Sequence, residues 1–377
     1  MTGRKLRPPA ERDFRGAAHD QRVTARIGLW LGIAFGICFL TGLLSQLARA
    51  GSGWPTSPVD LYRVTQGAHV VAGVAAIPLL LAKLWSVYPK LFARPLVRSL
   101  PHAIERGSIL VLSGAALFEV VTGLFNVAQN YVWGFGFPAA HHVAGWLAIG
   151  SVLVHVAVKL PVIRRGLTRG DGGERSAPPG GILTRRGFLR GTGLATGVAV
   201  VATAGAAVPL LRPVSPLSWR SDRGPQGVPV NRTARAAGVR AVDDSWRLTV
   251  VTPGGTRAFS LAELRALPQT SASLPIACVE GWNQSASWTG VPVADLLRLA
   301  GGAPGSPVRV RSLERRGAYR SSLLPGAHAA DPATLLALRL GDEPLALDHG
   351  YPCRLIAPSR PGVTQTKWVT RLEVEPR

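Results

Sequence analysis

Four long apolar stretches dominate the first half of the chain. Nearly uncharged runs of about 20 residues, the length that crosses a bilayer core, occupy positions 27–47, 64–82, 107–128 and 138–158. At a rise of about 1.5 Å per residue, a helix formed by each run spans roughly 30 Å. The pattern predicts an all-α transmembrane four-helix bundle over residues 27–168, preceded by a basic tail over residues 1–26.

The distribution of basic residues indicates how this bundle is oriented. The formal net charge is +22, and Lys plus Arg number 7 in residues 1–26, 5 in 83–106 and 8 in 159–190, against only Arg49 and Arg63 on the opposite side. Because positive residues flank membrane helices on the cytoplasmic side, the N-terminal tail is predicted to be cytoplasmic. The basic residues form no patch with interleaved aromatics, so we expect membrane lipid and no nucleic acid as a partner.

A motif that resembles an export signal follows the bundle. A Gly/Pro-rich linker at 169–183 leads to Thr-Arg-Arg-Gly-Phe-Leu at 184–189 and then to an uncharged Gly/Ala-rich stretch. Residues 184–211 match a twin-arginine export signal, retained as a fifth anchor helix or cleaved near 202–204. The alternative is an ordinary fifth helix with cytoplasmic charges. Either way residues 212–377 lie outside the cytoplasm of a bacterial cell, and export of a folded domain implies a cofactor acquired inside.

Histidines in the bundle form a pattern typical of b-type cytochromes. His141 and His155 are 14 residues apart on the fourth run, which returns them to within about 40° of one helix face and separates them by about 21 Å. We expect His69 to pair with His141 at an outer haem b, and His102 to pair with His155 at an inner one. His142 is an alternative to His141. The alternative for His102 is an interfacial histidine without a ligand role, so one or two haems are expected.

The C-terminal part has a different pattern, that of an α+β domain. Short strands are predicted at 246–252, 308–313, 354–357 and 368–374, and helices are predicted at a capping box of Ser260 and Glu263 and at 292–300. No glycine fingerprint of a nicotinamide site is present. Three cysteines without CxxC spacing exclude an iron–sulfur or zinc cluster built by this chain alone.

Cys278 carries the candidate chemistry of this domain. It ends a predicted buried strand, and a turn containing Gly281 is expected to lead into a helix. A thiolate is the soft ligand that a molybdenum–oxo centre needs beside a pterin dithiolene. The alternatives are a buried thiol without function and a disulfide with Cys353 in an oxidising compartment.

Several motifs of residues 212–377 resemble the molybdopterin-binding domain of the sulfite oxidase family. They are Ala-Cys-Val-Glu-Gly-Trp at 277–282, Gly-Asp-Glu-Pro-Leu at 341–345, Asp-His-Gly-Tyr-Pro-Cys-Arg at 348–354 and Thr-Lys-Trp at 366–368. The resemblance implies that Cys278 ligates molybdenum. It also implies that His349, Arg354 and Lys367 bind the pterin and its phosphate. Asn231 and Arg232 match an early cofactor-contact loop of the family.

The chain also departs from sulfite oxidases. Trp282 and Asn283 stand where that family places arginines that hold the oxyanion, and the match ends at Arg377, before the family's downstream tyrosine and dimerisation domain. Sulfite is therefore not the expected substrate. The cysteine motif is more similar to the bacterial periplasmic methionine sulfoxide reductase branch, whose partner is a separate haem-bearing membrane protein.

Together these features predict a membrane-bound molybdenum oxidoreductase that exchanges electrons with the quinone pool through b-type haems. The expected substrate is a small-molecule or protein sulfoxide. Two alternatives remain at this point: a sulfite-type dehydrogenase that passes electrons from substrate to quinone, and a membrane sensor or scaffold without turnover.

Overall fold

The computed structural model describes residues 16–51, 53–92, 95, 97–168, 184–218, 224–240, 242–315, 317 and 319–375. The first part of the basic tail and the predicted linker at 169–183 lie outside this range. The chain divides into two compact units. The helical unit comprises Met1–Leu40 and His69–Ala204, and the sheet unit comprises Thr41–Ala68 and Gly205–Arg377.

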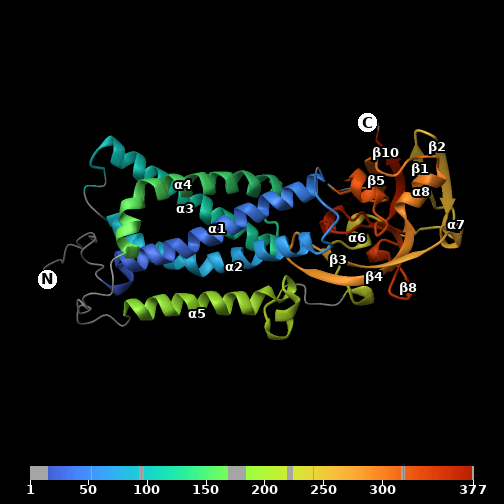
Figure 1. The fold of residues 1–377 in the computed structure, drawn as a ribbon. Helices are drawn as coiled ribbons and strands as arrows, with labels where there is room; N and C mark the ends of the chain where they lie inside the picture. The colour runs from blue at the N-terminus through green and yellow to red at the C-terminus, as the bar shows by residue number, and fades with distance from the viewer. Residues whose placement is uncertain are drawn as a thin grey trace, which may run out of the picture. The chain divides into compact units, whose positions relative to one another are not determined.

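Five long apolar helices account for the first half of the chain (Figure 1). They are α1 (Gln21–Ala50), α2 (Leu61–Val87), α3 (Leu100–Val127), α4 (Phe137–Thr168) and α5 (Arg185–Thr203). All five are long and apolar enough to cross a membrane, by length and composition. The four predicted spans and the fifth helix are therefore present, with each of the four spans longer than the apolar run that predicted it.

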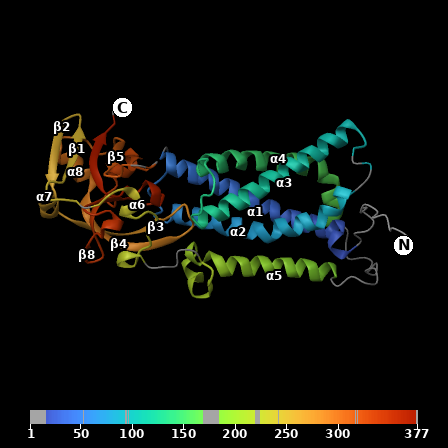
Figure 2. The same ribbon diagram turned by 180° about the vertical axis from the view of Figure 1, so that it is seen from behind.

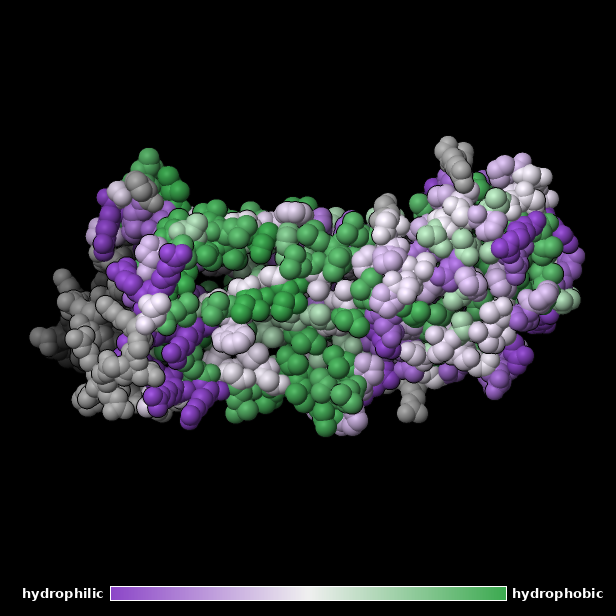
Figure 3. Space-filling model, in the orientation of Figure 1, coloured by the Kyte–Doolittle hydropathy of each residue, from purple (hydrophilic) through white to green (hydrophobic). Residues whose placement is uncertain are grey.

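The helices expose apolar side chains where a water-soluble protein would bury them. Leu40, Leu110 and Leu153 are each more than 60% exposed, and hydrophobic residues cover the helices in the space-filling view (Figure 3). Soluble proteins rarely leave so large a continuous apolar surface in water, so this surface fits a transmembrane domain. In the views from the front and from behind, α1 to α4 run side by side (Figure 2).

Local capping explains where two of these helices begin. The Ser99 hydroxyl accepts a hydrogen bond from the His102 backbone N–H at the start of α3. The Thr184 hydroxyl accepts one from Gly187 N at 3.0 Å, so the hydroxyl residue of the arginine motif is the N-cap of α5. Arg185 then forms an ion pair with Asp20 at 3.1 Å, within the helical unit.

The sheet unit contains an α+β domain, as predicted, and its strands form two five-stranded sheets. One sheet has the order β2-β1-β10-β5-β6, and the other has β3-β4-β7-β8 with β9 paired to β7. The strands of the first sheet are β1 (Arg247–Thr252), β2 (Gly255–Ser260), β5 (Val308–Ser312), β6 (Ser321–Leu324) and β10 (Val369–Val374). Those of the second are β3 (Thr270–Ala277), β4 (Asn283–Pro292), β7 (Leu335–Leu340), β8 (Glu343–Pro344) and β9 (Arg354–Ile356).

Short helices complete the domain, and one prediction about them is wrong. They are α6 (Ala234–Ala237), α7 (Leu261–Ala266), α8 (Val293–Leu299) and α9 (Gly326–Ala330). The Ser260–Glu263 capping box is present at α7, and α8 occupies the predicted helix. The turn at Gly281, however, leads into strand β4 rather than a helix, because residues 283–292 alternate in exposure and pair with β3, starting at Ala277 and Asn283.

Strand β7 separates the two hydrophobic clusters of the domain. Leu336 and Leu338 face the larger cluster around α8, whereas Leu335 and Ala337 face a smaller cluster that contains Cys278. Because side chains alternate along a strand, one strand serves both clusters. The candidate site lies beside the smaller one.

Candidate active site

A closed turn holds Cys278 directly after strand β3. The Cys278 N–H donates to Trp282 O at 2.8 Å, and the Gly281 N–H donates to Cys278 O at 3.0 Å. Gly281 has φ +92°, a backbone conformation that favours glycine. The Cys278 side chain is buried, with 1% of its surface exposed. The turn thus fixes the thiol at the edge of the β3–β4 hairpin.

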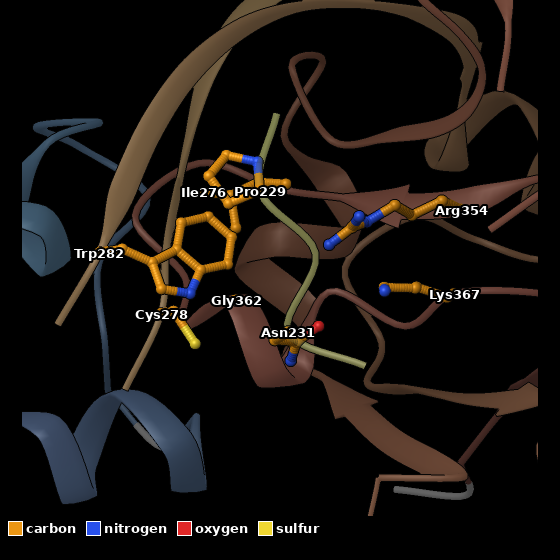
Figure 4. Close-up of a pocket in the computed structure, with 8 residues that line it drawn as sticks. All are labelled: Pro229, Asn231, Ile276, Cys278, Trp282, Arg354, Gly362 and Lys367. Atoms are coloured by element: carbon orange, nitrogen blue, oxygen red, sulfur yellow. The ribbon is translucent and has the colours of Figure 1, made fainter. Parts of the chain in front are cut away.

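A pocket in the sheet unit brings four of the predicted residues together. Its lining is Pro229, Asn231, Ile276, Cys278, Trp282, Arg354, Gly362 and Lys367. Cys278 and Trp282 lie on one side, Arg354 and Lys367 lie on the other, and Asn231 lies between them (Figure 4). Residues from four separate parts of the sequence therefore face one another across this space.

The pocket contains two cations, the buried Arg354 and the partly buried Lys367. Burial lowers the pKa of Arg354 to about 9, and burial followed by repulsion from Arg354 lowers the pKa of Lys367 to about 7. Lys367 Nζ donates to two backbone carbonyls, Arg232 O and Asp348 O, each at 2.8 Å. Neither cation forms an ion pair with a carboxylate in the described part of the chain. Two cations without a direct ion pair in one pocket are suited to bind an anionic group.

Buried polar atoms without partners support the same conclusion. Among the described residues, Arg354 Nε and His349 Nδ1 lack a hydrogen-bond partner. Because a buried polar atom without a partner costs free energy, Arg354 Nε, which belongs to the pocket lining, fits a donor to a bound group. Together with the thiol and Lys367, Arg354 matches the donor set of a pterin with a phosphate and a thiolate-ligated metal.

The remaining predicted pterin residues lie around the pocket. His349 is fully buried, its Nε2 lies 2.6 Å from Pro225 O, and its carbonyl accepts from Arg354 at 3.4 Å, so it lies behind Arg354. Burial lowers the pKa of His349 to about 4, which keeps the ring neutral. Arg232 does not line the pocket: its guanidinium pairs with Glu314, and only its carbonyl reaches Lys367. The predicted cofactor contact through Arg232 therefore has no support from its side-chain position.

The alternative of a disulfide does not occur in this structure. Cys278 and Cys353, both within the described residues, form no disulfide and belong to different hydrophobic clusters. Cys353 Sγ donates to Val369 O at 3.4 Å, and its burial raises the pKa of that thiol. Cys278 lines the pocket and Cys353 does not, so Cys278 is the candidate functional sulfur.

The helical unit brings one of the two predicted histidine pairs together. The ring centroids of His69 and His141 are 6.3 Å apart. His69 Nδ1 lies 3.0 Å from Cys38 O, and His141 Nδ1 lies 3.0 Å from the Thr122 hydroxyl. Each ring is therefore oriented through Nδ1, the arrangement that directs Nε2 of a histidine toward a metal. His141 Nε2 also lies 3.2 Å from Glu119 Oε2.

The second predicted pair is not brought into contact. No ring contact between His102 and His155 occurs among the described residues. His102 instead takes part in the start of α3, where its Nδ1 accepts from Arg98 N at 3.3 Å. His142, the alternative to His141, accepts from Trp146 Nε1 at 3.3 Å and lies apart from the pair. The structure thus favours His141 over His142 as the neighbour of His69.

Two residues at these sites were missed by sequence reasoning. Glu119 is a carboxylate within the third apolar run. An ionisable residue inside a membrane span is costly, and this was the available signal for a functional role. Gly362 lines the pocket, and a Cβ there would lie 3.0 Å from Ile276 and 3.1 Å from Ala277 O. The Pro361-Gly362 pair between Arg354 and Lys367 was the available signal for a turn at this place.

Within the described residues, no three His, Cys, Asp or Glu side chains cluster to hold a metal ion. The α+β fold and a pocket lined by one thiol and two cations define the class of domain to be compared with known proteins.

Comparison with known proteins identifies this domain. Residues 236–377 match the model of the oxidoreductase molybdopterin-binding domain. The chain is 28% identical to the mitochondrial sulfite oxidase of Drosophila melanogaster, over 40% of this chain and 26% of that protein. It is 33% identical to the putative protein-methionine-sulfoxide reductase subunit YedZ1 of Azospira oryzae, over 36% of this chain and 52% of that protein. It is also 33% identical to the protein-methionine-sulfoxide reductase catalytic subunit MsrP of Xanthomonas campestris, over 25% of this chain and 33% of that protein.

The C-terminal region is therefore a sulfite oxidase-like molybdopterin-binding oxidoreductase domain. The chain spans between about a quarter and a half of the length of these relatives. The N-terminal helices fit a transmembrane domain joined to it.

Proposed function

We propose that the protein is a membrane-bound molybdenum oxidoreductase that reduces a sulfoxide with electrons from quinol. The observation that carries this proposal is the pocket in which Cys278 faces the cations Arg354 and Lys367. Arg354 and Lys367 would hold the pterin phosphate, and Cys278 would be the protein ligand of molybdenum. When bound, the molybdenum–pterin group exchanges one oxygen atom and two electrons with the substrate.

The overall reaction balances without a further reactant. A sulfoxide and a quinol give a sulfide, a quinone and water: the S=O bond breaks, and its oxygen leaves with the two protons and two electrons of the quinol. The chain's residues orient the cofactor and exclude water. His349 stays neutral beside Arg354, so it adds no charge to the phosphate site.

The pocket favours an uncharged substrate. Trp282 replaces an expected oxyanion-binding arginine, and together with Ile276 and Pro229 it forms an apolar side of the pocket. Asn283 Nδ2 donates to Ala207 O at 2.6 Å. Arg354 and Lys367 are assigned to the phosphate, which leaves no lining cation for a sulfite dianion. A thioether sulfoxide, free or within a protein, suits this lining better.

A sulfite-type dehydrogenase is the second candidate, because the chain resembles the sulfite oxidase of D. melanogaster as well as methionine sulfoxide reductase subunits. In that case electrons run from substrate to quinone. The sensor or scaffold alternative differs from both, because such a protein need contain neither molybdenum nor iron.

We further propose that His69 and His141 would hold the iron of a b-type haem. The centroids of the two rings lie 6.3 Å apart, and each ring is oriented through its Nδ1 contact, which supports the assignment. Glu119, which contacts His141 Nε2, would yield this position to the iron. An inner haem held by His102 and His155 stays a prediction without a ring contact to support it.

The proposed location is the bacterial cell membrane, with the N-terminus cytoplasmic and the pocket extracytoplasmic. The distribution of Lys and Arg supports this orientation. The arginine pair at the start of α5 supports twin-arginine export of residues 212–377 after their cofactor has been inserted. Lipid surrounds the helices, and quinone is the membrane partner.

Metal analysis of the purified full-length protein tests the proposed class. We expect about one molybdenum per chain and one or two haem irons, with a low-spin b-type spectrum. Protein that carries its pterin but supports neither sulfoxide reduction nor sulfite oxidation would contradict an enzymatic role. Turnover of sulfite, and not of sulfoxide, would select the second candidate.

A further inference from the structure

The loop that carries Asn231 is joined to two other parts of the sheet unit. The Arg232 carbonyl accepts a hydrogen bond from Lys367 Nζ at 2.8 Å, while the Arg232 guanidinium forms an ion pair with Glu314. The same guanidinium donates through Nη2 to Ala236 O in α6 at 3.1 Å. The backbone and the side chain of Arg232 therefore contact different neighbours, and the backbone contact is the one that reaches a residue of the pocket lining.

Glu314 is the buried partner in this ion pair. Its side chain is 7% exposed, against 35% for Arg232. Glu314 follows strand β5, and its backbone N–H donates to Ser312 Oγ at 3.1 Å. The same hydroxyl donates to Lys367 O at 2.7 Å. A closed ring of contacts results, called here the Lys367 ring, with these members in order: Arg232, Glu314, Ser312 and Lys367.

The turn after Glu314 comes close to the ion pair because residue 317 is a glycine. Gly317 has φ +125°, a backbone conformation that favours glycine. A Cβ at this position would overlap with Arg232 Nη1 and with the Glu314 carboxylate. A larger residue at position 317 would therefore displace the two side chains of the pair.

Electrostatic interactions also connect Glu314 with Lys367. Burial and repulsion from Arg354 lower the pKa of Lys367, whereas Glu314 is among the acidic groups that raise it. Burial raises the pKa of Glu314, and the charges of Arg232 and Lys367 act in the opposite direction. Glu314 thus stabilises two cations, of which one contacts it directly and the other lines the pocket.

We propose that Arg232 and Glu314 are a positioning pair: they hold the backbone at Asn231 and Arg232 against Lys367, so that the ammonium group stays at the pocket. The ion pair fixes the end of the Arg232 side chain, and a polar network of this kind specifies one geometry. Arg232 acts through Lys367, and not as the direct cofactor contact that the family motif implied. The use of the pair in holding an anionic cofactor rests on the proposed function, whereas the Lys367 ring does not.

The first sheet contains a matched control for this pair. Arg309 of β5 forms an ion pair with Glu375, which follows β10, and 41% and 29% of their side chains are exposed. The pocket lining includes neither residue. Exposed ion pairs contribute little to stability, whereas breaking a buried pair costs more. Glu314→Gln removes the proposed pair, and Glu375→Gln removes a pair of the same kind outside the Lys367 ring.

Chemical labelling of Lys367 gives a readout that does not depend on turnover. Lys367 is the only lysine in residues 212–377, and the other four, at positions 5, 83, 90 and 159, are internal controls. The full-length protein, as purified, is treated with an amine-reactive reagent at mildly alkaline pH. The extent of modification at each lysine is then followed by mass spectrometry of its peptide.

Glu314→Gln should accelerate the labelling of Lys367 by about 10-fold, within the range for loss of a hydrogen bond to a charged group. Two effects act in the same direction. The ammonium loses its firmly held acceptor at Arg232 O, and loss of a nearby negative charge lowers the pKa of Lys367, so that more of the amine is neutral and reactive. Glu375→Gln should leave the labelling of Lys367 unchanged.

A double replacement distinguishes a pair from two independent structural roles. Arg232→Gln alone should also accelerate the labelling of Lys367. The double variant should show less than the product of the two single effects, because each single change already breaks the pair. Effects that multiply would overturn the proposal.

Gly317→Ala tests the pair without removing a charge, and it decides if Glu314→Gln does not accumulate. It should accelerate the labelling of Lys367 in the same way, because the added Cβ displaces both side chains. Unchanged labelling of Lys367 in Glu314→Gln, or equal acceleration in Glu375→Gln, would contradict the proposal. So would faster labelling of all lysines together with a lower Tm, which is the result of a general loss of stability.

Failure of the proposed function would give a different result. Released pterin is quantified in the same preparations, and Glu314→Gln should contain less of it than Glu375→Gln. A wild-type protein without pterin and molybdenum would overturn the proposed function. The labelling comparison would then still decide whether Arg232 and Glu314 position Lys367.

Discussion

The sequence predicted the pocket around Cys278 better than it predicted the histidine pairs of the helical unit. In the pocket, Asn231, Cys278, Arg354 and Lys367 converge as their motifs implied. Among the histidines, one predicted pair lies together and the other does not. Strand pairing fixes which residues lie opposite each other, as Ala337 and Arg354 do. Helical spacing predicts only the helix face and the depth at which a histidine lies. Motif spacing therefore predicts a site more reliably than shared depth in a bundle.

Loss of the thiol should have the largest effect. Cys278→Ser should keep the pterin, which Arg354 and Lys367 hold, and lower turnover more than about 100-fold, beyond the usual effect of an outer partner of a ligand. Cofactor content by fluorescence of released pterin and turnover with dye are measured together. Cys353→Ser is the control, and equal loss of activity in both variants would reject Cys278 as the ligand.

Replacing the arginine pair at the start of α5 should have the next largest effect, on the location of the C-terminal domain in the cell. Arg185→Lys with Arg186→Lys keeps the charge but destroys a twin-arginine signal. The helices before α5 should still insert, while residues 212–377 stay cytoplasmic. Protease added outside spheroplasts measures this, and normal cleavage of residues 212–377 in the variant would show that the signal does not operate.

The histidine comparison is sharpened by single replacements. His69→Ala or His141→Ala should remove one haem from the purified protein, because each removes a proposed axial ligand. His102→Ala should change haem content less, since its ring caps α3 rather than facing His155. Haem is quantified by pyridine haemochrome spectra. Full haem content in both His69→Ala and His141→Ala would exclude the outer pair.

The smallest expected effect is a pH dependence of stability. In cofactor-free protein, unfolding returns the pKa of Lys367 from about 7 to its ordinary value of 10.5. Between these pH values the unfolded state binds more protons, so the free energy of unfolding rises with pH, by up to about 1.4 kcal/mol per pH unit. Thermal unfolding of the full chain between pH 7 and 9 measures it. Lys367→Met should reduce the slope, and an unchanged slope would contradict the assignment.

Local signals in the sequence predicted much of the fold. The apolar runs predicted helices, and the Ser260–Glu263 capping box predicted α7, because both depend on residues close in sequence. The strand β4 after Gly281 was missed, since its identity depends on pairing with β3.

The packing of residues 41–68 within the sheet unit could not be predicted from local patterns. Gln66 and Val279 are 213 positions apart, and Trp54 and Ser359 are 305 apart. Neither pair lies in a motif, and both contacts depend on how the chain folds as a whole. The pocket residues were found because their motifs resemble those of a known family.

The most direct test follows the haem bands of the purified, quinol-reduced protein under anaerobic conditions when methionine sulfoxide is added. The account predicts that the reduced haem is reoxidised in the wild type and stays reduced in Cys278→Ser. Reduced haem bands that do not change in the wild type, or that reoxidise equally in Cys278→Ser, would contradict a route from quinol through haem to the Cys278 site.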